Sequence, residues 1–126
     1  MTSRRRALLR ALPAACLTAA ALTAAPGAAS PVGHAAKSCK APAYPGNGYF
    51  NALTVSGISC NSGRKLAVAH YKCRLQHGGI KGKCSSVSGY SCKESKRQSN
   101  SIEFDARVTC TSGSRRAQWV YQQNTH

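Results

Sequence analysis

Six cysteines constrain the fold of this chain more than any other feature of its sequence. All six follow an export-type leader, whereas the seventh, Cys16, lies within that leader. Thiols pair in an oxidising compartment and small domains gain stability from the cross-links, so an even set in a short exported chain predicts a disulfide framework. The framework cysteines are Cys39, Cys60, Cys73, Cys84, Cys92 and Cys110.

Residues 1–29 have the three parts of a cleavable signal peptide. Four arginines come first, an apolar run follows over residues 11–25, and a small-residue stretch ends at Ser30. Cleavage after Ala29 places Gly27 and Ala29 at the two positions that must be small. The apolar run is shorter than the roughly 20 residues of a spanning helix. We therefore predict general secretion and an extracellular mature chain.

The mature chain is strongly cationic. Loss of the leader arginines leaves 14 of the 18 Lys and Arg residues against Glu94, Glu103 and Asp105, a net charge of +11. Such a charge attracts polyanions in general, and it also keeps a secreted protein in solution. The length of the mature chain suits a single small domain, and we expect a monomer.

Local patterns predict an irregular arm over residues 30–47 and a folded domain over residues 48–126. Within the domain, Tyr49, Leu53 and Val55 share a face of a strand over residues 49–59. Asn61 or Ser62 then caps a helix that runs to about His77, where two glycines follow. The helix is expected to bury Leu66, Ala69 and Cys73 on one arc, with His70 and His77 beside them.

The C-terminal region predicts an antiparallel sheet. Apolar and polar residues alternate strictly from Ile102 to Cys110, as in a half-buried strand. A two-residue turn at 112–113 would pair Val108 with Ala117, Ala106 with Trp119 and Phe104 with Tyr121. An earlier strand over residues 87–96 would point Tyr90 and Cys92 inward. We therefore predict an α+β fold in which one helix packs on a small antiparallel sheet, in the order β-α-β-β-β.

Three short motifs occupy residues 57–60, 89–92 and 108–113, and the last of them precedes an aromatic-bearing strand. With these motifs the chain resembles a group of small secreted actinobacterial proteins that contain disulfides. The similarity covers roughly residues 49–121. It implies a disulfide scaffold without an assigned activity and carries no active site. Gly63 departs from the group, in which an alanine is usual at this position.

Spacing alone leaves the disulfide pairing open, because six cysteines permit fifteen arrangements. Cys73 and Cys84 fit a local staple across the loop that follows the helix. Cys60 with Cys92 and Cys39 with Cys110 is one completion. The alternative joins Cys92 to Cys110 across neighbouring strands and Cys39 to Cys60.

Catalytic and metal chemistry find little support in the sequence. No cysteine pair has the two-to-four-residue gap of zinc fingers or ribbons. General acid–base cleavage of RNA would draw on His70, His77 or Glu103, but Glu103 should face away from the helix that carries His70. We assign no catalytic residue, cofactor or metal, and keep a small ribonuclease-like hydrolase as an alternative.

The function that we predict is a secreted, cationic, disulfide-stabilised binding module; its ligand is left open, and anionic polymers are one candidate class. The candidate anion-binding residues gather toward two ends of the expected sheet, and they are Lys93, Lys96, Arg97, Arg115 and Arg116. A solvated surface that only maintains solubility explains the same charges equally well. A further alternative is an inhibitor or adaptor that presents the loop over residues 96–101 to an extracellular protein.

Overall fold

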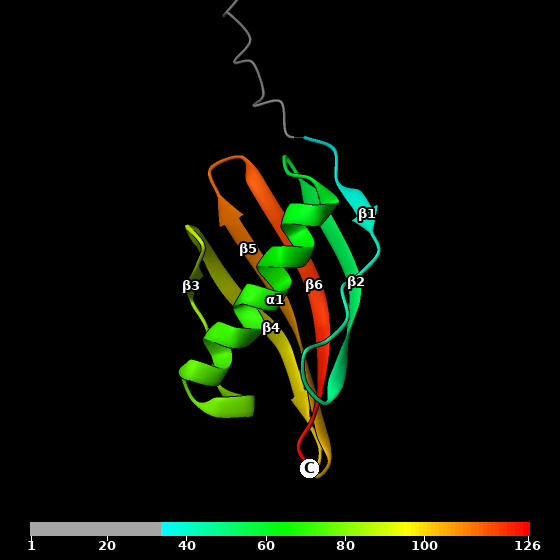
Figure 1. Ribbon diagram of the computed structural model, residues 1–126, viewed down its shortest axis with the longest axis vertical. Helices are drawn as coiled ribbons and strands as arrows, with labels where there is room; N and C mark the ends of the chain where they lie inside the picture. Colours follow the sequence, from blue (N-terminus) through cyan, green and yellow to red (C-terminus); the bar gives the residue numbers. More distant parts are fainter. Residues whose placement is uncertain (1–33) are drawn as a thin grey trace, which may run out of the picture. The chain divides into compact units, whose positions relative to one another are not determined.

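The computed structural model describes residues 34–126, so the predicted signal peptide and its cleavage site lie outside the described residues. Residues 34–126 form an antiparallel sheet, one α-helix and one short 3-10 helix (Figure 1). In chain order the elements are β1 (Lys37–Cys39), β2 (Gly48–Ser56), α1 (Cys60–Gln76), η1 (Gly79–Lys81), β3 (Ser86–Val87), β4 (Tyr90–Ser99), β5 (Glu103–Ser112) and β6 (Arg115–Asn124).

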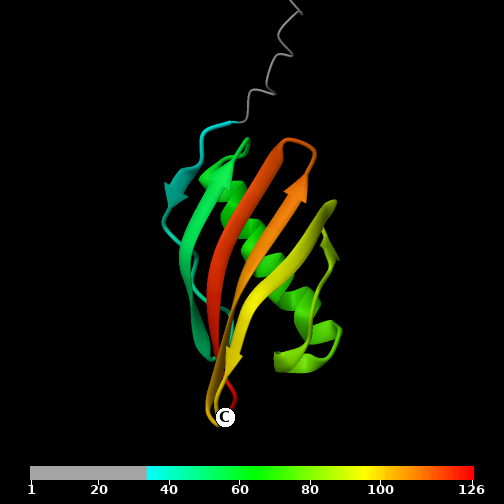
Figure 2. The ribbon, with the colours of Figure 1, turned by 180° about the vertical axis from the view of Figure 1, so that it is seen from behind.

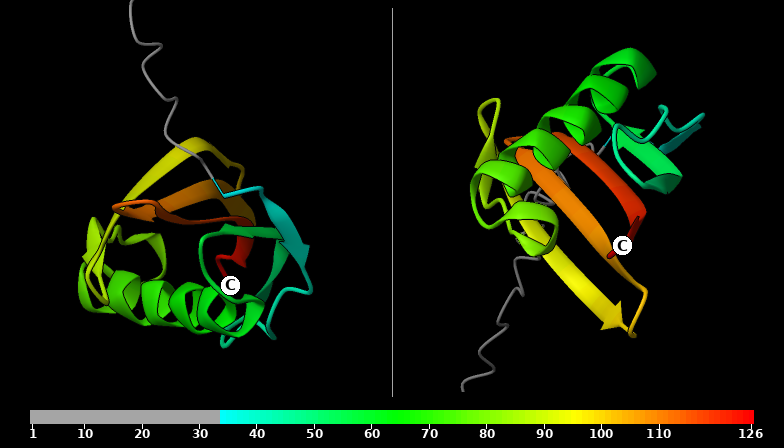
Figure 3. Two further views of the ribbon diagram at one scale, coloured as in Figure 1. Left: turned by 90° about the horizontal axis from the view of Figure 1, so that it is seen from above. Right: turned by 60° about the horizontal axis from the view of Figure 1, so that its bottom comes forward.

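The sheet has six strands in the order β1-β2-β6-β5-β4-β3. The helix α1 crosses one face, and no element of residues 34–126 covers the other (Figures 1 and 2). Seen from above, the sheet and the helix form two layers (Figure 3). The predicted helix-on-sheet α+β architecture is confirmed, but the sheet is larger than predicted. The expected irregular arm contributes β1, and the two residues of β3 extend the opposite edge.

A β-bulge in β2 changes which aromatic residue reaches the core. The pairing of β2 with β6 shifts between Asn51 and Thr54, and Ala52 adopts a positive φ of 51°. The extra residue reverses the alternation upstream, so Phe50 is buried and Tyr49 is 56% exposed. The prediction that Tyr49 shares the inner face with Leu53 and Val55 was therefore wrong, because a strict period of two does not continue through a bulge.

The N-cap of the helix lies two or three residues before the predicted cap. Ser59 is the N-cap residue, and its hydroxyl accepts a hydrogen bond from the Ser62 amide at 3.1 Å. The helix ends before His77, and Gly78 and Gly79 follow with positive φ angles. Its buried face differs from the predicted arc, since Ala69 and Cys73 are only partly buried. The buried helix residues are Gly63, Leu66, Ala67, His70, Tyr71 and Arg74.

The C-terminal hairpin has a different register from the predicted one. Its turn lies at 113–114, where Gly113 has φ of 58°, so Val108 pairs with Trp119 and Ala106 with Tyr121. The strands are therefore displaced by two residues relative to the expected pairing. A shift of two keeps every side chain on its face, so the predicted inner set is still buried.

The predicted loop over residues 96–101 is mostly strand. β4 continues to Ser99, and its pairing with β5 resumes after an irregularity between Ser95 and Gln98. The connection to β5 is only residues 100–102, where the Asn100 side chain accepts hydrogen bonds from the amides of Ile102 and Glu103. A compact turn replaces the projecting loop that the inhibitor alternative needed.

Three disulfides join the framework cysteines in pairs. Cys73–Cys84 staples the end of α1 to the segment before β3, as predicted. Cys39–Cys60 ties β1 to the start of α1, and Cys92–Cys110 links β4 to β5. The alternative completion is therefore the one found, and Cys60–Cys92 with Cys39–Cys110 was wrong. Cys92 and Cys110 are directly opposite in the sheet register, whereas α1 carries Cys60 toward the β1 edge.

Candidate anion-binding surfaces

The five predicted cations do not form one surface. Lys93 points to the uncovered face of the sheet, because its neighbour Cys92 is buried on the inner face. Arg116 lies on the same face, while Arg115 points to the helix side, with its guanidinium 5.3 Å from the Tyr90 ring centroid. Lys96 belongs to β4, and the structure describes its backbone but not its side chain.

Arg97 is a structural residue in this fold. Its guanidinium bonds Glu94 at 3.0 Å and donates to the Lys81 and Gly82 carbonyls at 3.1 and 3.2 Å. It also stacks over the Phe104 ring at 4.7 Å. Because these partners occupy its donors, Arg97 is a poor receptor for an external anion. The sequence pattern did not predict this position of Arg97, because the pairing of β4 with β5 is irregular between Ser95 and Gln98.

A second arginine completes a buried polar network beneath α1. Arg74 is 1% exposed, lies 3.7 Å from Glu94 Oε1, and stacks over the Tyr121 ring at 3.8 Å. It donates to the Ile80 carbonyl at 2.6 Å and to the Gly82 carbonyl at 3.2 Å. Burial raises the pKa of the Tyr121 hydroxyl, which donates to Glu94 at 3.0 Å. The Glu94 carboxylate therefore faces both guanidinium groups, and it supplies the buried Arg74 with the counterion that a buried charge requires.

The uncovered face of the sheet carries a separate cationic cluster. Lys93 is directly opposite Thr109, Arg107 is two residues along the same strand from Thr109, and Arg116 is diagonally across on β6. Sheet spacings place Lys93 and Arg107, which are diagonal neighbours on adjacent strands, about 8 Å apart, and they place Arg116 about 12 to 14 Å from either of them. None of the three cations forms an ion pair among the residues that the structure describes. We call Lys93, Arg107 and Arg116 the sheet-face cluster.

Acidic residues occupy the other end of that face. Asp105 precedes Arg107 by two positions on the outer side of β5, and Glu103 precedes Asp105 by two more, where it accepts a hydrogen bond from the Gln122 side-chain amide. The uncovered face is thus polarised, with cations toward the β5–β6 turn and carboxylates toward the chain end. Arg107 was absent from the sequence prediction, although the alternation over residues 102–110 already placed it on the outer face.

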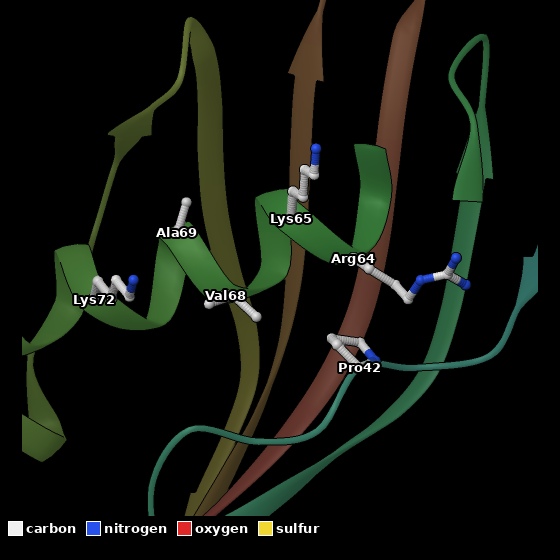
Figure 4. Close-up of a pocket in the computed structure, with 6 residues that line it drawn as sticks. All are labelled: Pro42, Arg64, Lys65, Val68, Ala69 and Lys72. Atoms are coloured by element: carbon white, nitrogen blue, oxygen red, sulfur yellow. The ribbon is translucent and has the colours of Figure 1, made fainter. Parts of the chain in front are cut away.

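A shallow groove of about 430 Å³ runs along the solvent side of α1 (Figure 4). Val68 and Ala69 form its apolar floor, and Pro42 from the segment before β2 forms one wall. Three cations border the groove, namely Arg64, Lys65 and Lys72. Lys65 and Lys72 are exposed residues of α1, and Pro42 is brought beside them only by the tertiary fold.

The residues that the hydrolase alternative needs lie in three separate places. His70 is 1% exposed, and its ring lies 5.5 Å from that of Trp119. Burial lowers the pKa of His70 to about 4, so the ring is neutral at pH 7. His77 is exposed at the end of α1, with Nδ1 2.8 Å from the Cys73 carbonyl. Glu103 is on the far face of the sheet. The described structure brings no acid–base pair together from these three.

Comparison with protein-family models, with curated proteins and with solved structures finds no match for this chain. Within residues 34–126, no helix has the length and apolar character that crossing a membrane requires.

Proposed function

We propose that this protein is a secreted binding module for anionic polymers, with the sheet-face cluster as its contact surface. The main support is that Lys93, Arg107 and Arg116 share a face without an ion-pair partner among the described residues, whereas Arg74 and Arg97 both contact Glu94. Unpaired cations on an open, flat face can meet successive charges of an extended polymer.

The polar surroundings of the cluster suit a sugar–phosphate or similarly polar chain. Thr109 lies among the three cations, and Gln118 donates to its hydroxyl at 3.0 Å. Ser91, Thr111 and Ser56 align with Arg116 across the sheet. These hydroxyls offer hydrogen bonds to polymer oxygens, while the cations supply most of the affinity through counterion release.

The test measures binding of the oxidised, exported protein to polyphosphate and to polyuridylate at several salt concentrations. Neutralising the cluster with Lys93→Gln, Arg107→Gln and Arg116→Gln should lower affinity about tenfold or more and reduce the salt slope by about 2, since each phosphate contact contributes about 0.7 to 0.9. The matched control carries Arg64→Gln, Lys65→Gln and Lys72→Gln, which remove the same charge from the helix. Equal losses in both variants would assign the binding to net charge alone.

Secretion belongs to the same proposal, and the three disulfides support it because such bonds persist in oxidising compartments. The intact mass of the exported protein should correspond to a chain that begins at Ser30 and has six fewer hydrogens than its reduced form. Free thiols in the native protein, or a retained signal peptide, would contradict secretion.

A further inference from the structure

The solvent side of α1 combines positive charge with one exposed apolar side chain, Leu75, and with the partly exposed Val68, which also packs against the core. Arg64, Val68, Lys72 and Leu75 follow one another at intervals of four, four and three residues, so they lie along a single stripe of the helix. Leu75 is 38% exposed, and Val68 lies in the floor of the groove. In Figure 4 Arg64 extends from the helix toward β2, beside Pro42, while Lys65 and Lys72, which are exposed, lie along the helix.

No acidic residue occurs anywhere in the sequence of α1. Of the carboxylates in the described structure, Glu94 is buried beneath the helix in the arginine network, while Glu103 and Asp105 belong to the opposite face of the sheet. The helix side is therefore uniformly cationic, and it is separated by the whole thickness of the fold from the sheet-face cluster. A partner at this side must be anionic and must also accept apolar groups.

We propose that the solvent side of α1 docks onto the surface of an anionic phospholipid membrane. Arg64, Lys65 and Lys72 would contact headgroup phosphates, while Val68 and Leu75 would face the boundary between headgroups and acyl chains. Each Lys or Arg near an anionic lipid surface contributes about 1 kcal/mol of attraction, and apolar side chains that enter the headgroup boundary add to the binding. This site is independent of the polymer site, because it uses other residues on the other side of the molecule.

The shape of the surface favours a membrane over a small soluble anion. The groove is shallow and open, so it cannot enclose a phosphate ion, and its floor offers methyl groups in place of hydrogen-bond donors. A 17-residue helix presents a side about 25 Å long, which spans several lipid headgroups. Exposed apolar residues such as Leu75 gain nothing from a hydrophilic polymer.

The experiment compares co-sedimentation of the oxidised, exported protein with vesicles of phosphatidylglycerol and phosphatidylcholine, and with vesicles of phosphatidylcholine alone. Binding should need phosphatidylglycerol. The helix variant with Arg64→Gln, Lys65→Gln and Lys72→Gln should lose roughly a hundredfold in affinity, at about fivefold per cation. The charge-matched Lys93→Gln, Arg107→Gln and Arg116→Gln variant should bind vesicles within about threefold of wild type. Similar losses in both variants would overturn the proposal.

A second pair of variants separates lipid docking from charge alone. Val68→Ser with Leu75→Ser keeps every charge, and it should weaken vesicle binding several-fold while leaving polyphosphate binding unchanged. Circular dichroism checks that this variant is folded. If the change leaves vesicle binding intact, or if millimolar inorganic phosphate displaces the protein from vesicles more strongly than chloride at equal ionic strength, the helix side is a simple anion site and the proposal fails. Failure here leaves the polymer test unaffected.

Discussion

The two faces of the sheet use arginine in opposite ways. On the inner face, Arg74 and Arg97 are held by Glu94, by backbone carbonyls and by aromatic rings. On the outer face, Arg107 and Arg116 have no ion-pair partner among the described residues. The comparison shows that an arginine cannot be assigned a structural or an anion-binding role from its residue type alone. A buried guanidinium must find a partner within the fold, whereas an exposed one stays available to an external anion.

The aromatic core should show the largest effect on the inner side. Trp119 is 1% exposed and packs between the sheet and His70. Trp119→Ala should lower the free energy of unfolding by about 3 to 5 kcal/mol, because it leaves a cavity in a closely packed core. Urea denaturation measures this loss. A native fluorescence maximum typical of water-exposed tryptophan would place the indole outside the core and contradict the packing.

The shared carboxylate should show the next largest effect. Glu94→Gln leaves Arg74 and Arg97 without a counterion, and we expect a loss of about 3 kcal/mol in the free energy of unfolding. Glu103→Gln removes one negative charge from the outer face and should change stability by about 0.5 kcal/mol or less. If the two variants were equally stable, the contrast between the faces would be lost.

Acid should weaken the inner side through His70. Its pKa is about 4 in the folded protein and about 6.5 in the unfolded chain, so the unfolded state binds the proton first as the pH falls. Stability should therefore fall between pH 6.5 and 4 by about 2 to 3 kcal/mol and be little affected by this group above pH 6.5. The charges of Glu94 and Arg74 also act on the pKa of His70, but Glu94 raises it and Arg74 lowers it, so these two effects oppose each other.

The His70→Phe variant isolates that dependence. Measured by urea denaturation across the same pH range, it should lack most of the slope seen in the wild type. His77→Gln is the matched control at an exposed ring and should retain the slope. A wild type and His70→Phe variant with parallel pH profiles would show that another group is responsible.

The smallest effect concerns the contact between helix and sheet. A Cβ atom at Gly63 would overlap Val55 Cγ1, so the missing side chain lets α1 approach β2 closely. Gly63→Ala gains helix propensity of about 1 kcal/mol but overpacks the contact by about 1 to 3 kcal/mol, for a net loss of about 1 kcal/mol. Val55→Ala should relieve the overlap, so the double variant should cost less than the sum of the two single changes. Additive losses would refute the contact.

Much of this organisation was predictable from short-range patterns. The alternation over residues 102–110 identified the inner set of β5, and the Gly78–Gly79 pair marked the end of α1. The local staple Cys73–Cys84 followed from sequence proximity and helix geometry. Each of these signals depends on neighbouring residues in the chain, whose directions are set by the 3.6- and 2-residue periods.

Bulges account for several of the errors. Because of the extra residue near Ala52, Phe50 is in the core in place of Tyr49. The irregularity after Ser95 brings Arg97 over the Phe104 ring, so that it is not a free cation. A bulge depends on the partner strand as much as on its own sequence, so a pattern that assumes strict alternation does not reveal it.

By itself, the sequence determined the even cysteine set, the strong positive charge and the helix-on-sheet class, because these depend on composition and local period. The tertiary structure decided which arginines are neutralised, which cations share a face, and that Pro42 meets the side of α1. Those outcomes depend on long-range pairing of strands and on the single carboxylate of Glu94. The physical reason is that charge is counted along the chain, whereas its availability to a ligand depends on burial and on partners that only folding brings close.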